Sequence, residues 1–227
     1  MKYVGSLLRN GTLRAAIILV VFVIIWGSMQ LGGLNLFLID GWLQLSLPLV
    51  IAAVGVTLVI FLGEFDMSAA GVMVLINVSM ATWLSDFGWF GVLIALGMGA
   101  AIGLFNGLMI VFLKLPAIAV TLSLLIVFEG LALVILPAPG GRVDPSIIDF
   151  FTGPFVIPRS IIFLVIIALL WFLYKNTRLG VHTFGVGQDA EALKLSGVNV
   201  SRVKVVVFII AGTLYGLAGV VLSAVVQ

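Results

Sequence analysis

Long apolar runs take up most of this 227-residue sequence and limit its fold more than any other feature. A helix needs roughly 20 residues to cross the apolar part of a bilayer, and the runs have about that length. They show no alternation of apolar and polar residues, so their backbone groups must pair within helices rather than in a barrel. The sequence therefore predicts an all-α, polytopic transmembrane helical bundle of about seven spans, at about residues 15–31, 43–62, 69–84, 90–113, 117–136, 160–174 and 205–226.

The composition indicates that lipid is the main solvent of the chain. Hydrophobic residues make up 63% of it and charged residues 9%, whereas a soluble domain of this length would need far more surface charge. The absence of cysteine and the single histidine, His182, exclude thiolate and histidine-cluster metal sites. No phosphate-binding loop or hydrolase nucleophile motif occurs. We therefore expect no enzyme, no catalytic residue, no metal and no cofactor bound by this chain.

The basic residues predict the orientation. If the N-terminus is cytoplasmic and the crossings alternate, nine of the eleven Lys and Arg residues fall inside and only Arg142 and Arg159 fall outside. This is the bias of the positive-inside rule. The polar segment 175–204, KNTRLGVHTFGVGQDAEALKLSGVNVSRVK, is then cytoplasmic.

A short helix is predicted within this polar segment. Gly185 and Gly187 should break the chain before it, acidic residues begin it, Lys194 lies near its end, and Gly197 should stop it. A helix of about two turns is marginal in water by itself, because its nucleation is costly. It is therefore expected to dock on a soluble partner, although a plain solvated connector between two spans has the same pattern.

Glycines at four-residue spacing occur in the fourth and seventh runs. They are Gly99, Gly103 and Gly107 in the fourth run and Gly212 and Gly216 in the seventh. Small residues at this spacing let helix backbones approach closely. Both helices are expected to pack inside a bundle or at a subunit interface.

Several polar residues lie within or at the edges of the apolar runs, where an acid near a helix centre costs about 3 kcal/mol. The hydroxyls of this set could instead bond back to their own helices, and Asn106 could make an interhelical hydrogen bond. Glu129 could be a structural acid or a proton relay. The candidates for a substrate pathway are Asp66, Ser68, Asn77, Asn106, Thr121, Ser123 and Glu129.

Three stretches together resemble the membrane permeases of bacterial ribose-type sugar ABC importers. They are GEFDMSAAG at 63–71, Asn106-Gly107 followed by PAIAVTL at 116–122, and the segment from Thr177 through SGVNV at 196–200 to Ala211-Gly212. The resemblance covers nearly the whole chain. It implies a permease subunit of the bacterial inner membrane that moves a monosaccharide, a pentose such as ribose or a similar sugar, by alternating access.

The resemblance also implies partners. These are a second permease subunit, identical or not, two cytoplasmic ATP-binding subunits that hold ATP and Mg, and a soluble sugar-binding protein on the outer side. The helix predicted in the polar segment would be the coupling helix that receives the motion of the ATPase. Its residues are Asp189, Ala190, Glu191, Ala192, Leu193, Lys194, Leu195, Ser196 and Gly197.

The sequence departs from the pattern of these permeases in three respects. Glu129 stands where they usually have an arginine, Gly180-Val181 stands where they usually have Gly-Arg, and their last third is missing. We therefore expect a single transmembrane permease domain at 1–227, incomplete at its C-terminus, with a cytoplasmic coupling loop at 175–204. Two alternatives stay open: a proton-coupled secondary transporter or channel that uses Glu129 and Asp66, and an inactive subunit that only assembles with others.

Overall fold

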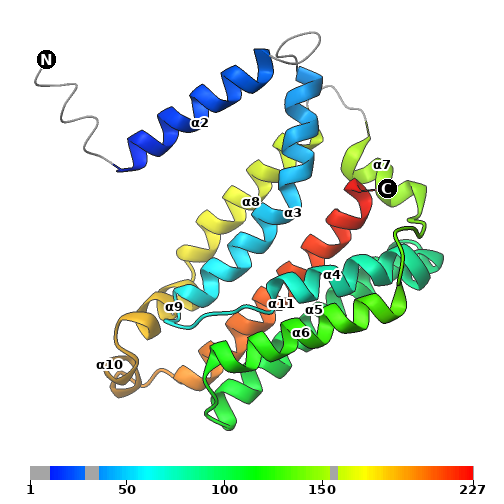
Figure 1. Cartoon of the computed structure of the whole chain (residues 1–227). Helices are drawn as coiled ribbons and strands as arrows, with labels where there is room; N and C mark the ends of the chain where they lie inside the picture. The colour runs from blue at the N-terminus through cyan, green and yellow to red at the C-terminus, as the bar shows by residue number, and fades with distance from the viewer. Residues whose placement is uncertain (1–10, 29–35, 154–157, 227) are drawn as a thin grey trace, which may run out of the picture. The chain divides into compact units, whose positions relative to one another are not determined.

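A computed structural model of the chain describes residues 11–28, 36–153 and 158–226, and the regular structure of these residues is entirely helical (Figure 1). The all-α prediction is confirmed. The helices are α2 (Gly11–Ser28), α3 (Leu36–Ile60), α4 (Ala69–Ser79), the π-helix η1 (Met80–Leu84), the 3-10 helix η2 (Ser85–Phe87), α5 (Trp89–Phe112), α6 (Ala117–Ile135), α7 (Pro145–Thr152), α8 (Arg159–Lys175), α9 (Arg178–Gln188), α10 (Ala190–Leu195) and α11 (Val200–Val225).

Five helices in the described residues are long and apolar enough to cross a membrane. The number rises to six if α8 and α9, which are bent by 72°, count as one span. The polytopic fold is confirmed, but the number is lower than the seven predicted. At six spans, the difference from seven is the first run, of which the described residues contain only the apolar stretch Ile17–Ser28; at five spans, the sixth run, which is α8, is missing as well. The five spans are Leu38–Ile60, Ala69–Phe87, Trp89–Phe112, Ala117–Ile135 and Val200–Val225.

The chain divides into two compact units, residues 1–42 and 43–227. In the smaller unit, α2 exposes apolar side chains such as Ile18, Leu19 and Phe22 on several sides. A helix that is apolar all round is typical of a lipid environment.

In the larger unit, α11 packs against α5 so closely that their backbones touch. A Cβ atom added at Gly103 would lie 2.1 Å from the carbonyl oxygen of Phe208, and one added at Gly212 would lie 2.3 Å from that of Gly99. Gly107 and Gly216 face the same partner helices. All five glycines singled out by their spacing therefore lie along this one contact.

The proline- and glycine-rich stretch between α6 and α8 contains a helix that was not predicted. Asp144 caps α7, because its Oδ1 accepts a hydrogen bond from the backbone N of Ser146 at 2.7 Å, and Pro145 occupies the first helical position. Hydrogen bonds from the side chain and the backbone of Ser146 hold the pKa of the exposed Asp144 carboxyl below its usual range. Ile147 and Phe151 are buried and join the helix to the core. The capping signal was present in the sequence.

The prediction that Gly185 and Gly187 break the chain is wrong. Both lie inside α9, whose N-cap Thr177 accepts a hydrogen bond from Gly180 N at 3.0 Å. A Cβ atom at Gly187 would lie 2.1 Å from the carbonyl oxygen of Phe61, and one at Gly185 would lie 2.9 Å from a methyl group of Leu193. These glycines serve close packing of α9 and leave it helical.

Candidate functional site

The segment between α3 and α4, residues 61–68, is the centre of the candidate site, and we call it the linker segment. Residues 61–63 form a turn at the end of α3, and residues 64–67 then run without regular structure to the start of α4 (Figure 1). Gly63 adopts a φ of 77°, a left-handed conformation that favours glycine. The chain thereby turns out of α3 beside Gly187 of α9.

Four of the seven predicted pathway residues meet at the end of the linker segment in a buried polar cluster, which consists of Asp66, Ser68, Asn106 and Thr121. The backbone N and Oγ of Ser68 donate to Oδ1 of Asp66 at 2.8 and 2.6 Å, and Nδ2 of Asn106 donates to Oγ of Ser68 at 3.0 Å. The backbone N of Met67 donates to Oγ1 of Thr121 at 3.0 Å. The cluster thus ties the linker segment to α5 and α6.

The hydroxyl groups on α6 bond back to their own helix. Oγ1 of Thr121 donates to the carbonyl oxygen of Ala117 at 2.9 Å, and Oγ of the exposed Ser123 donates to that of Ala119 at 2.8 Å. Thr121 differs from Ser123, because its oxygen also accepts the hydrogen bond from the linker segment. Asn106 makes an interhelical hydrogen bond, and its Oδ1 is buried without a partner among the described residues.

Tyr215 of α11 belongs beside this cluster, and sequence reasoning missed it. The side chain is only 1% exposed, and a Cβ atom at Gly55 of α3 would lie 2.6 Å from its ring. Its hydroxyl interacts electrostatically with the carboxyl of Asp66, although it lacks the geometry of a hydrogen bond to any described residue. Burial raises the pKa of the Asp66 carboxyl, which lies between two candidate spans, and the hydrogen bonds from Ser68 oppose this. The sequence shows only a tyrosine inside an apolar run, which packing alone also explains.

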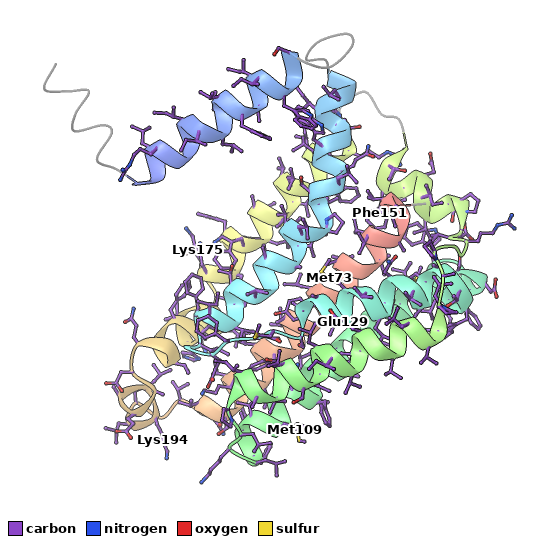
Figure 2. All side chains as sticks on the ribbon, viewed as in Figure 1. Met73, Met109, Glu129, Phe151, Lys175 and Lys194 are labelled. Carbon is purple, nitrogen blue, oxygen red and sulfur yellow. The ribbon has the colours of Figure 1, made fainter. Side chains whose placement is uncertain are left out.

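The other three candidates lie apart from the polar cluster. Asn77 of α4 is half-buried and lines a cavity of about 430 Å³, together with Pro139, Gly140 and neighbouring residues. Ser123 and Glu129 are on the exposed side of α6, where Figure 2 labels Glu129. Only 17% of the span formed by α6 is buried, the smallest share among the five spans. An acid on so open a span needs a polar neighbour or water at membrane depth.

A larger cavity, of about 670 Å³, lies between α3, α8 and α11 and is lined almost entirely by apolar side chains. Leu58, Phe163, Trp171 and Leu214 are among them. A sugar in this cavity would bury its hydroxyl groups without hydrogen bonds, which is unfavourable. The cavity is therefore no candidate for a sugar site.

The predicted short helix is present as α10, and it is capped at both ends. Oδ1 of Asp189 accepts a hydrogen bond from the backbone N of Ala192 at 2.9 Å. At the other end, Gly197 has a φ of 87° and its N donates to the carbonyl oxygen of Lys194 at 3.0 Å, while Val198 N donates to that of Leu193 at 3.3 Å. This is the Schellman arrangement.

The surface of α10 is open. None of its six residues is buried, and Leu195 is 91% exposed. Figure 2 labels Lys194 at the end of this helix. A rigid, capped helix that displays an apolar side chain is suited to insertion into a groove of another protein.

An ion pair that sequence reasoning missed joins the linker segment to α11. Nζ of Lys204 contacts Oε1 of Glu64, and the two side chains are 24% and 22% exposed. Partial burial reduces the screening of such a pair by solvent and salt. Among the described residues, no group of three or more His, Cys, Asp or Glu side chains could hold a metal ion.

Comparison with known proteins gives one family over most of the chain. The family described as "Branched-chain amino acid transport system / permease component" matches residues 38–227. The fructose import permease protein FrcC of Rhizobium meliloti is 31% identical over 89% of this chain and 61% of its own length. The galactofuranose transporter permease protein YtfT of Escherichia coli is 30% identical over 80% of this chain and 55% of its own length.

The ribose import permease protein RbsC of Escherichia coli is 29% identical over 75% of this chain and 56% of its own length. The chain thus spans less than two thirds of the length of these three relatives. No solved structure matches the chain at a significant level.

Proposed function

This chain belongs to the family of branched-chain amino acid transport system permease components, and from that premise we propose that it is a permease subunit of an ABC importer for a monosaccharide. The family consists of membrane permeases, so the chain is a multi-pass membrane protein of a transport family and not an enzyme. Its relatives include fructose, galactofuranose and ribose permeases, which supports a monosaccharide as substrate. A pentose such as ribose is the substrate that we propose first.

The observation that carries this proposal is α10, a capped helix with an exposed apolar side chain in a polar segment. A permease driven by ATP must be attached to a soluble ATPase, and a capped helix with an exposed apolar side chain can provide the point of attachment. In this proposal residues 189–197 dock on an ATP-binding subunit, which holds ATP and Mg. A second permease subunit and an outer sugar-binding protein complete the importer.

The pathway in this proposal follows the exposed side of α6. Ser123 and Glu129 offer a hydroxyl and a carboxyl there, and Asn77 lines the 430 Å³ cavity near the 136–141 segment. The buried polar cluster does not line this path but holds α6 in place, because it fixes α6 to the linker segment. Its residues are Asp66, Ser68, Asn106 and Thr121. Weak, separated polar groups suit a pathway that must release its sugar quickly.

Mass spectrometry of the proteins that copurify with this chain from its native membrane tests the proposal. We expect an ATP-binding subunit and a second permease subunit. Vesicles that contain the complex should take up radiolabelled ribose or another monosaccharide only when ATP is supplied on the side of α10. Isolation of the chain alone, with uptake that needs no ATP, would contradict the importer.

A proton-coupled transporter is the second candidate, because Glu129 is exposed on α6 and Asp66 is buried beside Tyr215. In that case a pH gradient without ATP should drive uptake, and Glu129→Gln should abolish it. In the importer we expect Glu129→Gln to leave the need for ATP unchanged. Uptake measured in vesicles under each driving force separates the two.

A further inference from the structure

We propose that the linker segment carries motion from the α9–α10 pair to α6, and that Glu64, Lys204 and Gly187 are positioning residues for this step. The inference rests on the proposed function in one respect: it takes α10 as the site where the ATPase docks. It goes further by naming the residues that transmit a displacement from this docking site to α6, the helix that carries the proposed pathway groups. The contacts form an unbroken series, which can be followed from α10 inward.

First, α10 and α9 are joined without a flexible residue between them. Asp189 is both the C-cap of α9 and the N-cap of α10. The side chain of Leu193 packs onto α9 at Gly185, where an added Cβ atom would lie 2.9 Å from its methyl group. A partner that pulls or tilts α10 therefore moves α9 with it.

Second, α9 holds the start of the linker segment. Gly187 lies against Phe61 so closely that an added Cβ atom would be 2.1 Å from the carbonyl oxygen of Phe61. The rings of Phe61 and Phe184 are 4.4 Å apart, centre to centre. Close-packed contacts of this kind transmit a displacement because they cannot be compressed.

Third, α11 holds the next part of the linker segment through the ion pair of Glu64 and Lys204. Lys204 lies in the first turns of α11, nine residues after α10 ends at Leu195. The segment from α9 to α11 thus reaches the linker segment at two neighbouring points, Gly187 of α9 on Phe61 and Lys204 of α11 on Glu64. Two points fix the direction in which the linker segment moves, whereas one would leave it free to turn.

Fourth, the far end of the linker segment holds α6 and α5. Met67 N donates to Oγ1 of Thr121 on α6 at 3.0 Å, and Ser68 Oγ accepts from Nδ2 of Asn106 on α5 at 3.0 Å. Ser123, two residues after Thr121, is on the exposed side of the same helix. A shift of the linker segment is therefore passed to the helix that carries the proposed pathway groups.

The ion pair is tested in the purified complex with its ATPase. Glu64→Gln and Lys204→Met should each lower the sugar moved per ATP hydrolysed by about 2- to 30-fold, the range for substitutions along coupled networks. ATPase copurification and thermal stability should stay close to the unsubstituted protein. The exchange of charges, Glu64→Lys with Lys204→Glu, should restore most of the coupling. Unchanged coupling in both single variants would overturn the role of the pair.

A second test needs no ATPase, so its failure can be told apart from failure of the proposed function. Hydrogen–deuterium exchange is measured on the chain in lipid nanodiscs with Gly187→Ala, which forces α9 away from Phe61. Gly97→Ala on α5 is the matched control, because an added Cβ atom there meets nothing within 4 Å. We expect faster exchange in α6 around Thr121 for Gly187→Ala and no change for the control.

Faster exchange confined to α9 would overturn the inference. A response of α6 together with an absence of any copurifying ATPase would support the link and contradict the importer instead. If Gly187→Ala does not fold, the same exchange measurement on Glu64→Gln tests the inference. That variant adds no heavy atom and keeps the size of the side chain. An unchanged α6 in Glu64→Gln would then count against the inference.

Discussion

At the scale of single residues, Thr121 joins the linker segment to α6 through one oxygen atom. Thr121→Val keeps the shape of the side chain but leaves the amide of Met67 without its acceptor. An unpaired, partly buried donor costs about 1–3 kcal/mol, so the Val variant should melt at a lower temperature. Hydrogen exchange of the Met67 amide should speed up in Thr121→Val.

Thr121→Ser is the matched control, since it removes a methyl group and keeps the hydroxyl. We expect slow exchange of the Met67 amide in this variant, as in the unsubstituted chain. Equal exchange rates in the Val and Ser variants would show that the hydroxyl does not hold the linker segment.

The residues of the polar cluster could be predicted only in part. Asp66, Ser68, Asn106 and Thr121 stand out because each is a polar group at or near membrane depth. Tyr215 does not stand out, because a tyrosine in an apolar run is compatible with packing alone and its proximity to Asp66 depends on how α11 sits. The Glu64–Lys204 ion pair could not be predicted for the same reason. The two residues are far apart in the chain, and only the packing of the helices brings them together.

At the scale of elements, the contact between α5 and α11 depends on missing side chains. Gly103→Ala places a methyl group 2.1 Å from the carbonyl oxygen of Phe208, a backbone atom that cannot move aside by a rotamer change. Overpacking of this kind typically costs about 1–3 kcal/mol, and a clash with backbone should reach at least the upper end of that range. The folded yield in detergent should fall. Gly97→Ala, on the same helix but in open space, should fold normally, and equal yields would contradict the packing argument.

The C-terminal cap of α10 gives a second test at this scale. Gly197 has a positive φ, and an added Cβ atom there meets nothing within 4 Å, so Gly197→Ala acts through backbone strain alone. The left-handed conformation costs a residue with a side chain about 1–2 kcal/mol, except that Asn tolerates it better. We expect faster hydrogen exchange in α10 for Gly197→Ala than for Gly197→Asn, with the exchange of α11 unchanged. No difference between Ala and Asn would argue against the Schellman arrangement.

Local signals explain which elements could be predicted. Asp189, Lys194 and Gly197 predict α10 because capping depends on neighbouring residues. α9 was missed because glycines weaken a helix in isolation, and here the contacts at Phe61 and Leu193 outweigh that tendency. Tertiary packing of this kind is absent from a sequence pattern.

At the scale of the whole molecule, the apolar runs predict a polytopic helical protein but not every crossing. The bend of 72° between α8 and α9 depends on contacts across it. The hydroxyls of Tyr174 and Thr183 are 2.7 Å apart, and a Cβ atom at Gly180 would lie 2.1 Å from the carbonyl oxygen of Tyr174. Sequence patterns indicate where a polar segment begins, whereas the direction of the chain after it is set by such contacts.

The orientation of the molecule decides whether α10 can meet an ATPase, and it can be measured directly because the chain contains no cysteine. Leu195→Cys places a thiol on the exposed surface of α10, and Ser146→Cys places one on the exposed start of α7. With the first run as a crossing, the bias of nine basic residues to two predicts that α10 is cytoplasmic and α7 is outside. A membrane-impermeant maleimide should then label Leu195→Cys only in inside-out vesicles and Ser146→Cys only in right-side-out vesicles. The opposite pattern would place α10 on the side without ATP. No ATPase could then dock on α10, and coupling through the linker segment would be contradicted.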